Sequence, residues 1–428
     1  MAEIAVGAGA VIAAEQVVST TVEAGIVGYM VTKPTLPLKA TFTKFADAKD
    51  DGTTRSLARA NHSLTVVGNK AYIFGGTTDA GDATNDIHIV TLGEEVQPES
   101  DYHLVPALPN EDGGPVPVAR DAHAACSYEK RVAIYGGFCQ GEAIDESCCI
   151  WTFDTEKLTW AKLQAANADS TPGPRAFSKM FAHDDFIFLY GGTDSSSSPL
   201  KDLWRFDINA ETWTRLPDAP CAATNAAVAN GVLYLISSKE HLSSELHHFD
   251  LSAQATDLTW QTLVFPTNPM APGPQGRNHA GLLPIMTGYG RNYLVYFLGQ
   301  KQEDDSDTKK GEQEKPTQWS DMWSLQLPSS APTTSTTSTI KEALKPANIK
   351  DKIRSVVGAE THEYSWAEME LKVPDDLGTT EGKLHPGPRS WFGNDVMSDG
   401  KSIVFWGGWQ DGESERVGDG WMIRFEVA

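Results

Sequence analysis

Short apolar runs that end in two glycines recur along most of the chain. An example is Ala71-Tyr72-Ile73-Phe74-Gly75-Gly76, and the others occupy residues 132–137, 187–192 and 403–408. β-Branched and aromatic residues in such runs predict strands. A glycine pair at the end predicts positive φ or a close backbone neighbour there. Regular recurrence predicts a repeat architecture, because propeller repeats are about 40–50 residues long.

The polar positions around these strands divide the chain into six repeating units. The third unit is the most regular: Arg175 opens it, Gly191-Gly192 ends its apolar strand, and Trp204, Asp207 and Trp213 follow. In the fourth unit Ser237-Ser238 replaces the glycines, and the fifth unit keeps only Gly299. Six units predict an all-β, six-bladed propeller.

The stretch Ala40–Phe45 alternates polar and apolar residues and therefore predicts a strand ahead of the first complete unit. The sixth unit ends near Phe425 without a final strand, so we expect the N-terminal strand to complete its blade and close the ring. The predicted propeller spans residues 40–428. Polar loop insertions are expected at about 300–318 and about 328–363, where charged residues and then Ser, Thr and Pro dominate.

Residues 1–35 are predicted to form an amphipathic helix and a linker, because apolar residues recur there at helical spacing. Glu3 stands where a signal peptide would carry basic residues. Glu15 and Glu23 interrupt the apolar stretch and make a membrane span unfavourable. We therefore expect this helix to pack on the propeller or on a second copy of itself.

The repeated pattern resembles the kelch repeat. The resemblance rests on an apolar strand, Gly-Gly, a variable loop, an aromatic residue with Asp (Trp204, Phe206-Asp207) and a later Trp213. It covers Ala40 to Ala428. One helix followed by a single propeller is similar to the one-domain kelch proteins of filamentous fungi. The resemblance implies a propeller that serves as an interaction module or, less often, as an enzyme.

Composition narrows the range of partners and the cell compartment. The chain has 428 residues, 40% hydrophobic content and a formal charge of −22. This charge disfavours nucleic acids and anionic membranes as partners. The five cysteines have no disulfide-framework spacing, which predicts reduced thiols and a cytoplasmic protein, with the nucleus as the alternative.

Candidate binding residues lie at the start of each unit, which in a propeller reaches one mouth of the central channel. The predicted set around this funnel mouth is Arg59, Asn61, His62, Arg120, His123, Arg175, Arg277, Asn278, His279, Arg389 and Trp391. Guanidinium groups in a ring would bind a carboxylate, a phosphate or an acidic peptide through bidentate hydrogen bonds. The alternative is structural, with each arginine paired to an acidic residue or to carbonyls of the next blade.

Other chemistry has weaker support in the sequence. His247 and His248 are adjacent on a predicted strand and would point to opposite faces, so we expect no metal site there. We also expect no cofactor, since the chain contains no Walker loop, dinucleotide fingerprint or nucleophile elbow.

Two functions remain open, and the sequence predicts no oligomeric state for either. In the first, the funnel mouth of an intracellular interaction module binds a protein or peptide. In the second, a metal-free isomerase, cyclase or lyase acts on a small anionic metabolite in the same funnel, for example in a fungal secondary-metabolite pathway. His123 or His279 would then move a proton.

Overall fold

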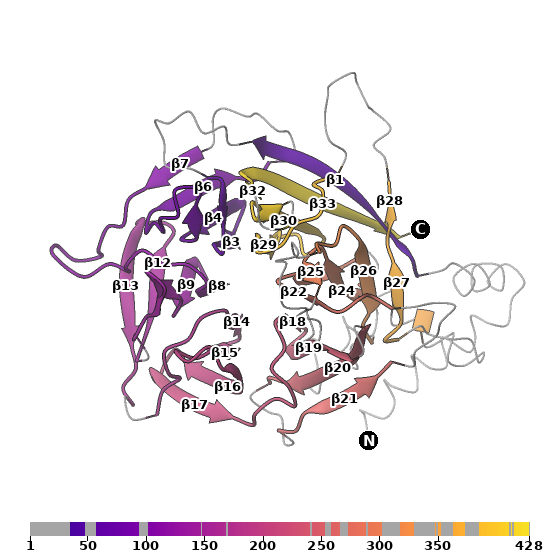
Figure 1. Ribbon diagram of the computed structural model, residues 1–428. Helices are drawn as coiled ribbons and strands as arrows, with labels where there is room; N and C mark the ends of the chain where they lie inside the picture. Colours follow the sequence, from indigo (N-terminus) through magenta and orange to yellow (C-terminus); the bar gives the residue numbers. More distant parts are fainter. Residues whose placement is uncertain are drawn as a thin grey trace, which may run out of the picture.

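Six β-sheets surround a central channel in a computed structural model of the chain (Figure 1). The structure describes residues 35–47, 57–93, 102–146, 148–167, 170–239, 242–252, 258–265, 273–287, 290–301, 317–328, 347, 350–351, 363–372, 385–410, 412 and 415–427. In each sheet the first strand lies next to the channel and the last lies at the rim (Figure 1). The predicted six-bladed propeller is confirmed.

The first three blades have four antiparallel strands each. Blade 1 consists of β3 (Ser63–Val67), β4 (Lys70–Phe74), β6 (Ile87–Thr91) and β7 (Tyr102–Val105). Blade 2 consists of β8 (Ala124–Tyr128), β9 (Arg131–Tyr135), β12 (Cys149–Asp154) and β13 (Thr159–Gln164). Blade 3 consists of β14 (Lys179–His183), β15 (Phe186–Thr193), β16 (Pro199–Asp207) and β17 (Thr212–Leu216).

Blades 4 and 5 keep this order despite their drifted sequences. Blade 4 consists of β18 (Asn225–Ala229), β19 (Val232–Lys239), β20 (Leu242–Asp250) and β21 (Gln261–Val264). Blade 5 consists of β23 (Gly281–Met286), β24 (Asn292–Phe297), β26 (Met322–Gln326) and β27 (Trp366–Glu368).

Blade 6 joins the two ends of the propeller. Its strands are β29 (Gly393–Val396), β30 (Ser402–Trp406), β33 (Asp419–Val427), β1 (Leu38–Asp47) and the short β28 (Glu370–Leu371). Strand β1 pairs antiparallel with β33, from Leu38 opposite Val427 to Asp47 opposite Asp419. The predicted closure by an N-terminal strand is therefore confirmed, and the ring has no open sheet edge at its seam.

The hydrophobic core is divided among the six interfaces between neighbouring blades. The described residues form six buried clusters, and each draws on two adjacent blades. Between blades 1 and 2, for example, the Phe74 ring lies 5.0 Å from that of Trp160. Alternate strand residues face opposite neighbours, so each blade is buried on both faces. This explains the almost continuous apolar runs in the second strands.

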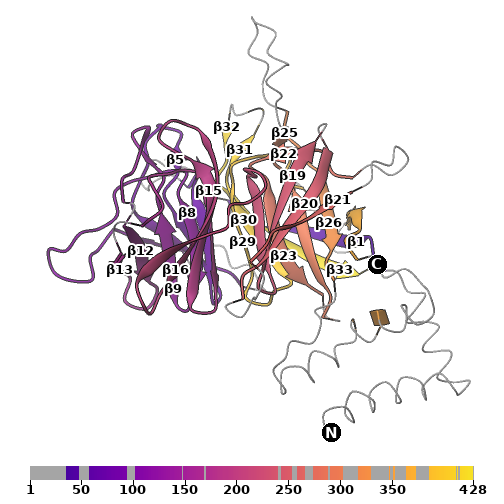
Figure 2. The ribbon, with the colours of Figure 1, turned by 90° about the horizontal axis from the view of Figure 1, so that it is seen from below.

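Short two-stranded sheets, of which β10–β11 and β31–β32 are hairpins, extend four of the blades beyond one mouth of the channel. The pairs are β2 (Arg59–Ala60) with β5 (Thr77–Thr78), β10 (Phe138–Cys139) with β11 (Glu142–Ala143), β22 (Arg277–Asn278) with β25 (Gln300–Lys301), and β31 (Trp409–Gln410) with β32 (Glu415–Arg416). Several of them project on the same side of the ring in Figure 2. We call this side the hairpin face.

Two predictions concern residues that the structure leaves undescribed. The N-terminal helix of residues 1–35 lies outside the described residues, apart from Thr35. Most of the two predicted insertions, at about 300–318 and 328–363, also lies outside them. The domain limits drawn from the sequence therefore stay predictions.

The paired glycines occur where the backbone of the next blade comes closest. Gly136 has φ +64°, and a Cβ there would press on the main-chain oxygen of Arg175. Gly407, at the end of β30, would bring a Cβ to 2.6 Å from the oxygen of Arg59. Only a residue without a side chain fits such a site.

We predict that Gly136→Ala lowers the free energy of unfolding by about 2–4 kcal/mol, from left-handed backbone strain plus overpacking. Gly68→Ala is the matched control, because Gly68 has φ +63° with no atom within 4 Å of the position that a Cβ would take. The control should lose only the backbone part, about 1–2 kcal/mol. Urea unfolding of both variants measures the difference, and equal losses would contradict the role given to the interblade contact.

Candidate functional site

The five arginines that open the blades are buried rather than displayed at the channel mouth. Arg175 is 2% exposed, and the other four, Arg59, Arg120, Arg277 and Arg389, are 0% exposed. Each guanidinium donates a hydrogen bond to the carbonyl that ends the second strand of its own blade. The acceptors are the oxygens of Gly75, Gly136, Gly191, Leu298 and Gly407, at 2.8–3.1 Å.

Each of these arginines also contacts a polar or acidic side chain. Arg175 forms a two-pronged pair with Asp202, at 2.8 and 2.9 Å. Arg277 pairs with Asp321 and Arg389 with Asp419 in the same way. Arg120 pairs with Glu146 at 3.0 Å, and Arg59 contacts His88 Nε2 at 2.8 Å. The structural alternative explains these contacts, and the geometry leaves no ring of guanidiniums facing a ligand.

The arginines lower the pKa values of the aspartates with which they pair. Burial alone would raise the pKa of Asp202, but hydrogen bonds and charge from Arg175 outweigh it and hold that pKa below its usual value. Asp321 and Asp419 have lowered pKa values for the same combination of causes. The Trp204 indole also donates to Asp202, at 2.6 Å. The repeated Asp and Trp are therefore parts of one buried polar unit.

Blade 4 replaces this unit with a different set of side chains. Cys221 stands at the arginine position, and the Ser237 hydroxyl lies 3.0 Å from His247 Nε2 and 3.2 Å from Glu245. His247 also contacts the Thr262 hydroxyl at 2.8 Å. This cluster joins strands β19, β20 and β21, so it does for blade 4 what the Arg–Asp pair does elsewhere.

The histidine pair behaves as the strand geometry requires. His247 is buried within blade 4, whereas His248 stacks 6.1 Å from the Tyr364 ring, on the other face of the strand. No group of three metal-ligating side chains occurs among the described residues. His241 lies outside them.

A ring of main-chain hydrogen bonds marks the channel mouth on the hairpin face. Asn61, Ala122, Phe177, His279 and Trp391 occupy equivalent positions in five blades, and all have positive φ. The amide of Asn61 donates to the Trp391 carbonyl, that of Ala122 to Asn61 and that of Phe177 to Ala122, at 2.7–3.0 Å. A longer bond of 3.4 Å joins Trp391 to His279. Within the described part of the chain, no equivalent bond links blade 4 to its neighbours.

Aromatic side chains from blades 2, 3, 5 and 6 meet over this mouth. The His279 and Trp391 rings stack with centroids 3.1 Å apart, and Phe177 lies 5.2 Å from Trp391. Phe138 of β10 packs 5.5 Å from Phe177. Because blades 3 and 6 face each other across the ring, the Phe177–Trp391 contact crosses the channel. We call these four partly exposed side chains, Phe138, Phe177, His279 and Trp391, the aromatic floor.

The hairpins around the aromatic floor carry mainly acidic side chains. Asp79, Asp82, Glu142 and Glu415 are exposed there, with Lys301 as an exposed base. Arg416 stacks on the Trp409 ring at 4.0 Å and lies 3.8 Å from Asp79, so its charge is partly used within the face. We call these hairpin positions the acidic rim.

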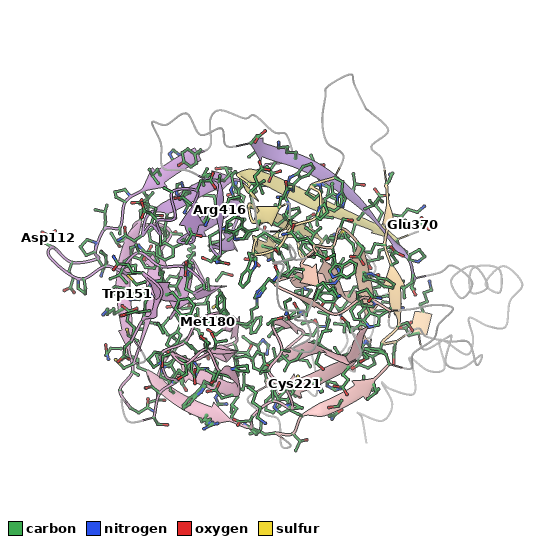
Figure 3. The ribbon with its side chains drawn as sticks, viewed as in Figure 1. Asp112, Trp151, Met180, Cys221, Glu370 and Arg416 are labelled. Atoms are coloured by element: carbon green, nitrogen blue, oxygen red, sulfur yellow. The ribbon has the colours of Figure 1, made fainter. Side chains whose placement is uncertain are left out.

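A cavity of about 360 Å³ lies in the channel, lined by residues from all six blades. A smaller space of about 100 Å³ lies directly below the aromatic floor. His62, His123 and Lys179 line both this space and the larger cavity. Figure 3 shows side chains from the inner strands converging on this axis, with Met180 of β14 labelled. This volume is in the range of small-molecule sites.

The two histidines at the cavity are wedged between blades. His123 Nε2 lies 2.9 Å from the Ser63 hydroxyl of blade 1, and His62 Nε2 accepts the Gly393 amide of blade 6 at 3.3 Å. Burial, with the charge of Arg120, lowers the pKa of His123 to about 3. Burial and Arg59 also hold the pKa of His62 well below its usual value. Both imidazoles are therefore neutral at physiological pH.

Several cavity residues were missed by the sequence reasoning. Lys179 of β14 and Asp395 of β29 lie on opposite blades, and Cys126 of β8 lies between them at the cavity wall. Burial raises the pKa of Asp395 to about 6, although the Val66 amide donates to its carboxylate at 2.7 Å. The sequence signal that could have found Lys179 and Asp395 is a charged residue in an inner strand made mainly of small or apolar residues.

The remaining predicted residues lie near the mouth without forming one site. Asn278 accepts a hydrogen bond from the Thr224 hydroxyl at 3.0 Å, which bridges blades 4 and 5. Trp391 Nε1 donates to Gln300 at 3.2 Å. Asn61, His62 and His123 line the small space below the aromatic floor. The non-arginine candidates thus lie near the mouth, whereas the arginines are buried within the blades.

Comparison with known proteins agrees with this repeated geometry. Residues 61–283, just over half of the chain, match the model of the KLHDC2/KLHL20/DRC7 Kelch-repeats domain. This chain belongs to the kelch-repeat family. Members of the family typically mediate protein interactions. The resemblance inferred from the sequence is thus confirmed as a family, while the filamentous-fungal type stays a prediction.

Relatives and solved structures support the family and the fold. The chain is 26% identical to Tip elongation aberrant protein 3 of Schizosaccharomyces pombe over 38% of its own length and 16% of the relative's. It is 27% identical to Kelch domain-containing protein 3 of Rattus norvegicus over 37% of its length and 44% of that protein's. The chain thus matches less than half of each relative. The structure titled "Structure of YjhT" has a TM-score of 0.54 and 12% identity, covering 84% of this chain and 93% of the other, and so supports the fold alone.

All five cysteines are free thiols. No helix among the described residues is long and apolar enough to cross a membrane.

We predict that Arg175→Ala lowers the free energy of unfolding by about 3–5 kcal/mol, because it leaves Asp202 buried without its partner. Arg215→Ala is the control. Arg215 also pairs with an aspartate, Asp218 at 2.9 Å, but both side chains are largely exposed. The control should lose at most about 1 kcal/mol. Chemical denaturation compares the two, and a fully stable Arg175→Ala protein would restore the functional interpretation of the arginines.

We also predict that stability falls as the pH drops from about 6.5 towards 3. His62, His123 and His279 have pKa values lowered by burial, so the unfolded chain takes up protons first in this range. Asp395 opposes this trend, since its raised pKa makes the folded state take up a proton between about 4 and 6. The stability lost through the three histidines exceeds the stability gained through Asp395. In urea melts across this range, His123→Asn should flatten the slope, whereas replacement of the exposed His103 should not.

Proposed function

We propose that this kelch propeller is an interaction module that binds a protein segment at the aromatic floor. The observation that carries the proposal is a cluster of partly exposed aromatic rings at the centre of a face surrounded by polar hairpins. Aromatic side chains in the middle of a polar rim are typical of binding hot spots. The main-chain hydrogen-bond ring below holds these rings in place, which reduces the entropy lost on binding.

The charge of the acidic rim suggests which kind of segment binds. Exposed Asp79, Asp82, Glu142 and Glu415 favour a partner with lysine or arginine near an apolar side chain. An acidic peptide, one of the ligands that the arginine hypothesis allowed, finds no ring of exposed guanidiniums among the described residues. The overall charge of −22 acts in the same direction. We place this activity in the cytoplasm, with the nucleus as the alternative.

A metal-free enzyme acting on a small anionic metabolite is the second candidate. The observation that favours it is a single cavity that holds the imidazoles of His62 and His123 and the carboxylate of Asp395. Both imidazoles are engaged between blades, however, and their lowered pKa values make them poor proton donors at neutral pH. We therefore rank recognition of a protein segment first.

We predict that the double variant Phe177→Ala/Trp391→Ala weakens partner binding at least tenfold, since both side chains form the aromatic floor. Partners are first captured from native extract with the full chain and identified by quantitative mass spectrometry. Titration with the purified partner then measures the affinity. The control is Val264→Ala, at a side chain that is 66% exposed on the outer strand β21.

Two results would contradict the proposal. One is unchanged affinity for the double variant when its circular dichroism and melting midpoint show that it is folded. The other is a partner whose affinity does not change when the basic residues of its bound segment are replaced. A partner lost equally with Val264→Ala would locate the interface on the outer rim instead.

A further inference from the structure

The central cavity contains one lysine that no described residue neutralises. Lys179 is the first residue of β14 and lines both the large cavity and the small space below the aromatic floor. Among the described residues, no carboxylate or hydrogen-bond acceptor contacts its ammonium group. Burial and the charge of Lys179 hold the pKa of His279 well below its usual value, so this imidazole adds no positive charge to the region. Lys179 is only partly buried, and an ammonium group without a described partner in a cavity is available to an anionic ligand.

The surrounding wall supplies polar groups that are also unsatisfied. Asn225 is 4% exposed; its amide nitrogen donates to the Arg277 carbonyl at 2.7 Å, but its oxygen has no partner. Ser178, also 4% exposed, has a hydroxyl without a partner, and so does the side-chain oxygen of Asn61. Ser178 lines both spaces, as Lys179 does, whereas Asn61 lines the smaller space and Asn225 the larger one. Buried polar atoms without partners are rare, and these three are available to hydrogen-bond a ligand in the channel.

The interface between blades 3 and 4 differs from the others because blade 4 lacks the opening arginine. Lys179 belongs to blade 3, and in the neighbouring blade 4 Cys221 replaces the opening arginine. At the four interfaces that do not involve blade 4, a glycine amide donates to the carbonyl of an opening arginine. Towards blade 4, the Tyr190 hydroxyl donates to the Cys221 carbonyl instead, at 2.8 Å. The interface between blades 3 and 4 therefore departs from the regular pattern.

We propose that the channel binds a small monocarboxylate whose carboxylate pairs with Lys179 and whose hydroxyl groups bond to Ser178, Asn61 and Asn225. A single ammonium among neutral imidazoles matches one negative charge. A phosphate or dicarboxylate would bring a second charge that nothing in the described cavity neutralises, and Asp395 would repel it. The cavity of about 360 Å³ limits the ligand to metabolite size.

This site goes beyond the proposed function and uses none of the aromatic floor's rings for recognition. It lies inside the channel, whereas the protein segment binds outside it. A failed anion test therefore leaves binding at the aromatic floor untouched, and loss of partner binding leaves the Lys179 site untouched. Burial lowers the pKa of Lys179, so the affinity for a carboxylate should decrease as the pH rises and the ammonium loses its proton.

Thermal unfolding of the full chain with lactate and with glycerate tests the site at constant ionic strength. We expect each carboxylate to raise the unfolding midpoint in a saturable way, whereas uncharged lactamide has no effect. Lys179→Met should weaken both effects at least tenfold. Lys201→Met, which removes an exposed lysine of β16 in the same blade, should leave them unchanged.

The ligand-free variants distinguish a binding role from a structural one. Removal of a partly exposed charge that has no described partner should leave the midpoint of Lys179→Met equal to or above that of the wild type. A marked decrease, seen also in Lys179→Gln, would show that the ammonium supports the fold and would overturn the proposal. Absence of any saturable effect of lactate and glycerate would overturn it as well, and so would a larger effect of inorganic phosphate.

Discussion

An arginine at the start of a blade holds two neighbouring blades through two different parts of the same residue. In Arg120, the guanidinium donates to the Gly136 carbonyl of its own blade, while its main-chain oxygen accepts the Gly76 amide of the blade before it. Arg175, Arg389 and Arg59 repeat this arrangement at other interfaces. Since the side chain and the carbonyl are both buried, neither contact is weakened by water.

The glycine pair and the repeated aspartate follow from that arginine. The first glycine must lack a side chain because the arginine carbonyl of the next blade occupies the space. The aspartate neutralises the buried guanidinium, as Asp202 does for Arg175. In blade 4, where Cys221 stands in place of the arginine, the other members of the motif are lost as well. Serines replace the glycines, and Glu245 and His247 replace the Asp and Trp. The motif changes as a unit because its members share one hydrogen-bond network.

The same network separates the parts of the molecule that are free to bind from those that are not. Every opening arginine is used inside the ring, so the exposed chemistry is left to residues just after it and to the hairpins. Phe177, His279 and Trp391 are held at positive φ over the channel, and their side chains present an aromatic surface. Below them, the interruption at blade 4 coincides with an unneutralised Lys179. A rigid ring thus carries two different surfaces, one at the mouth and one inside.

The fold followed from the sequence because its signals are local and repeated. Glycines after apolar strands, as at Gly75-Gly76, count the blades, and the lone strand at Phe42 predicts the closure with β33. The candidate site did not follow in the same way. The sequence placed arginine beside Asn61, His62 and Trp391 but does not show which way each side chain points. That direction depends on whether a residue faces the neighbouring blade or the channel, and on partners such as Asp202 or Gly191 far along the chain. Only the tertiary structure therefore assigned the arginines to the framework, brought Phe177, His279 and Trp391 together, and left Lys179 in the cavity without a counter-charge among the described residues.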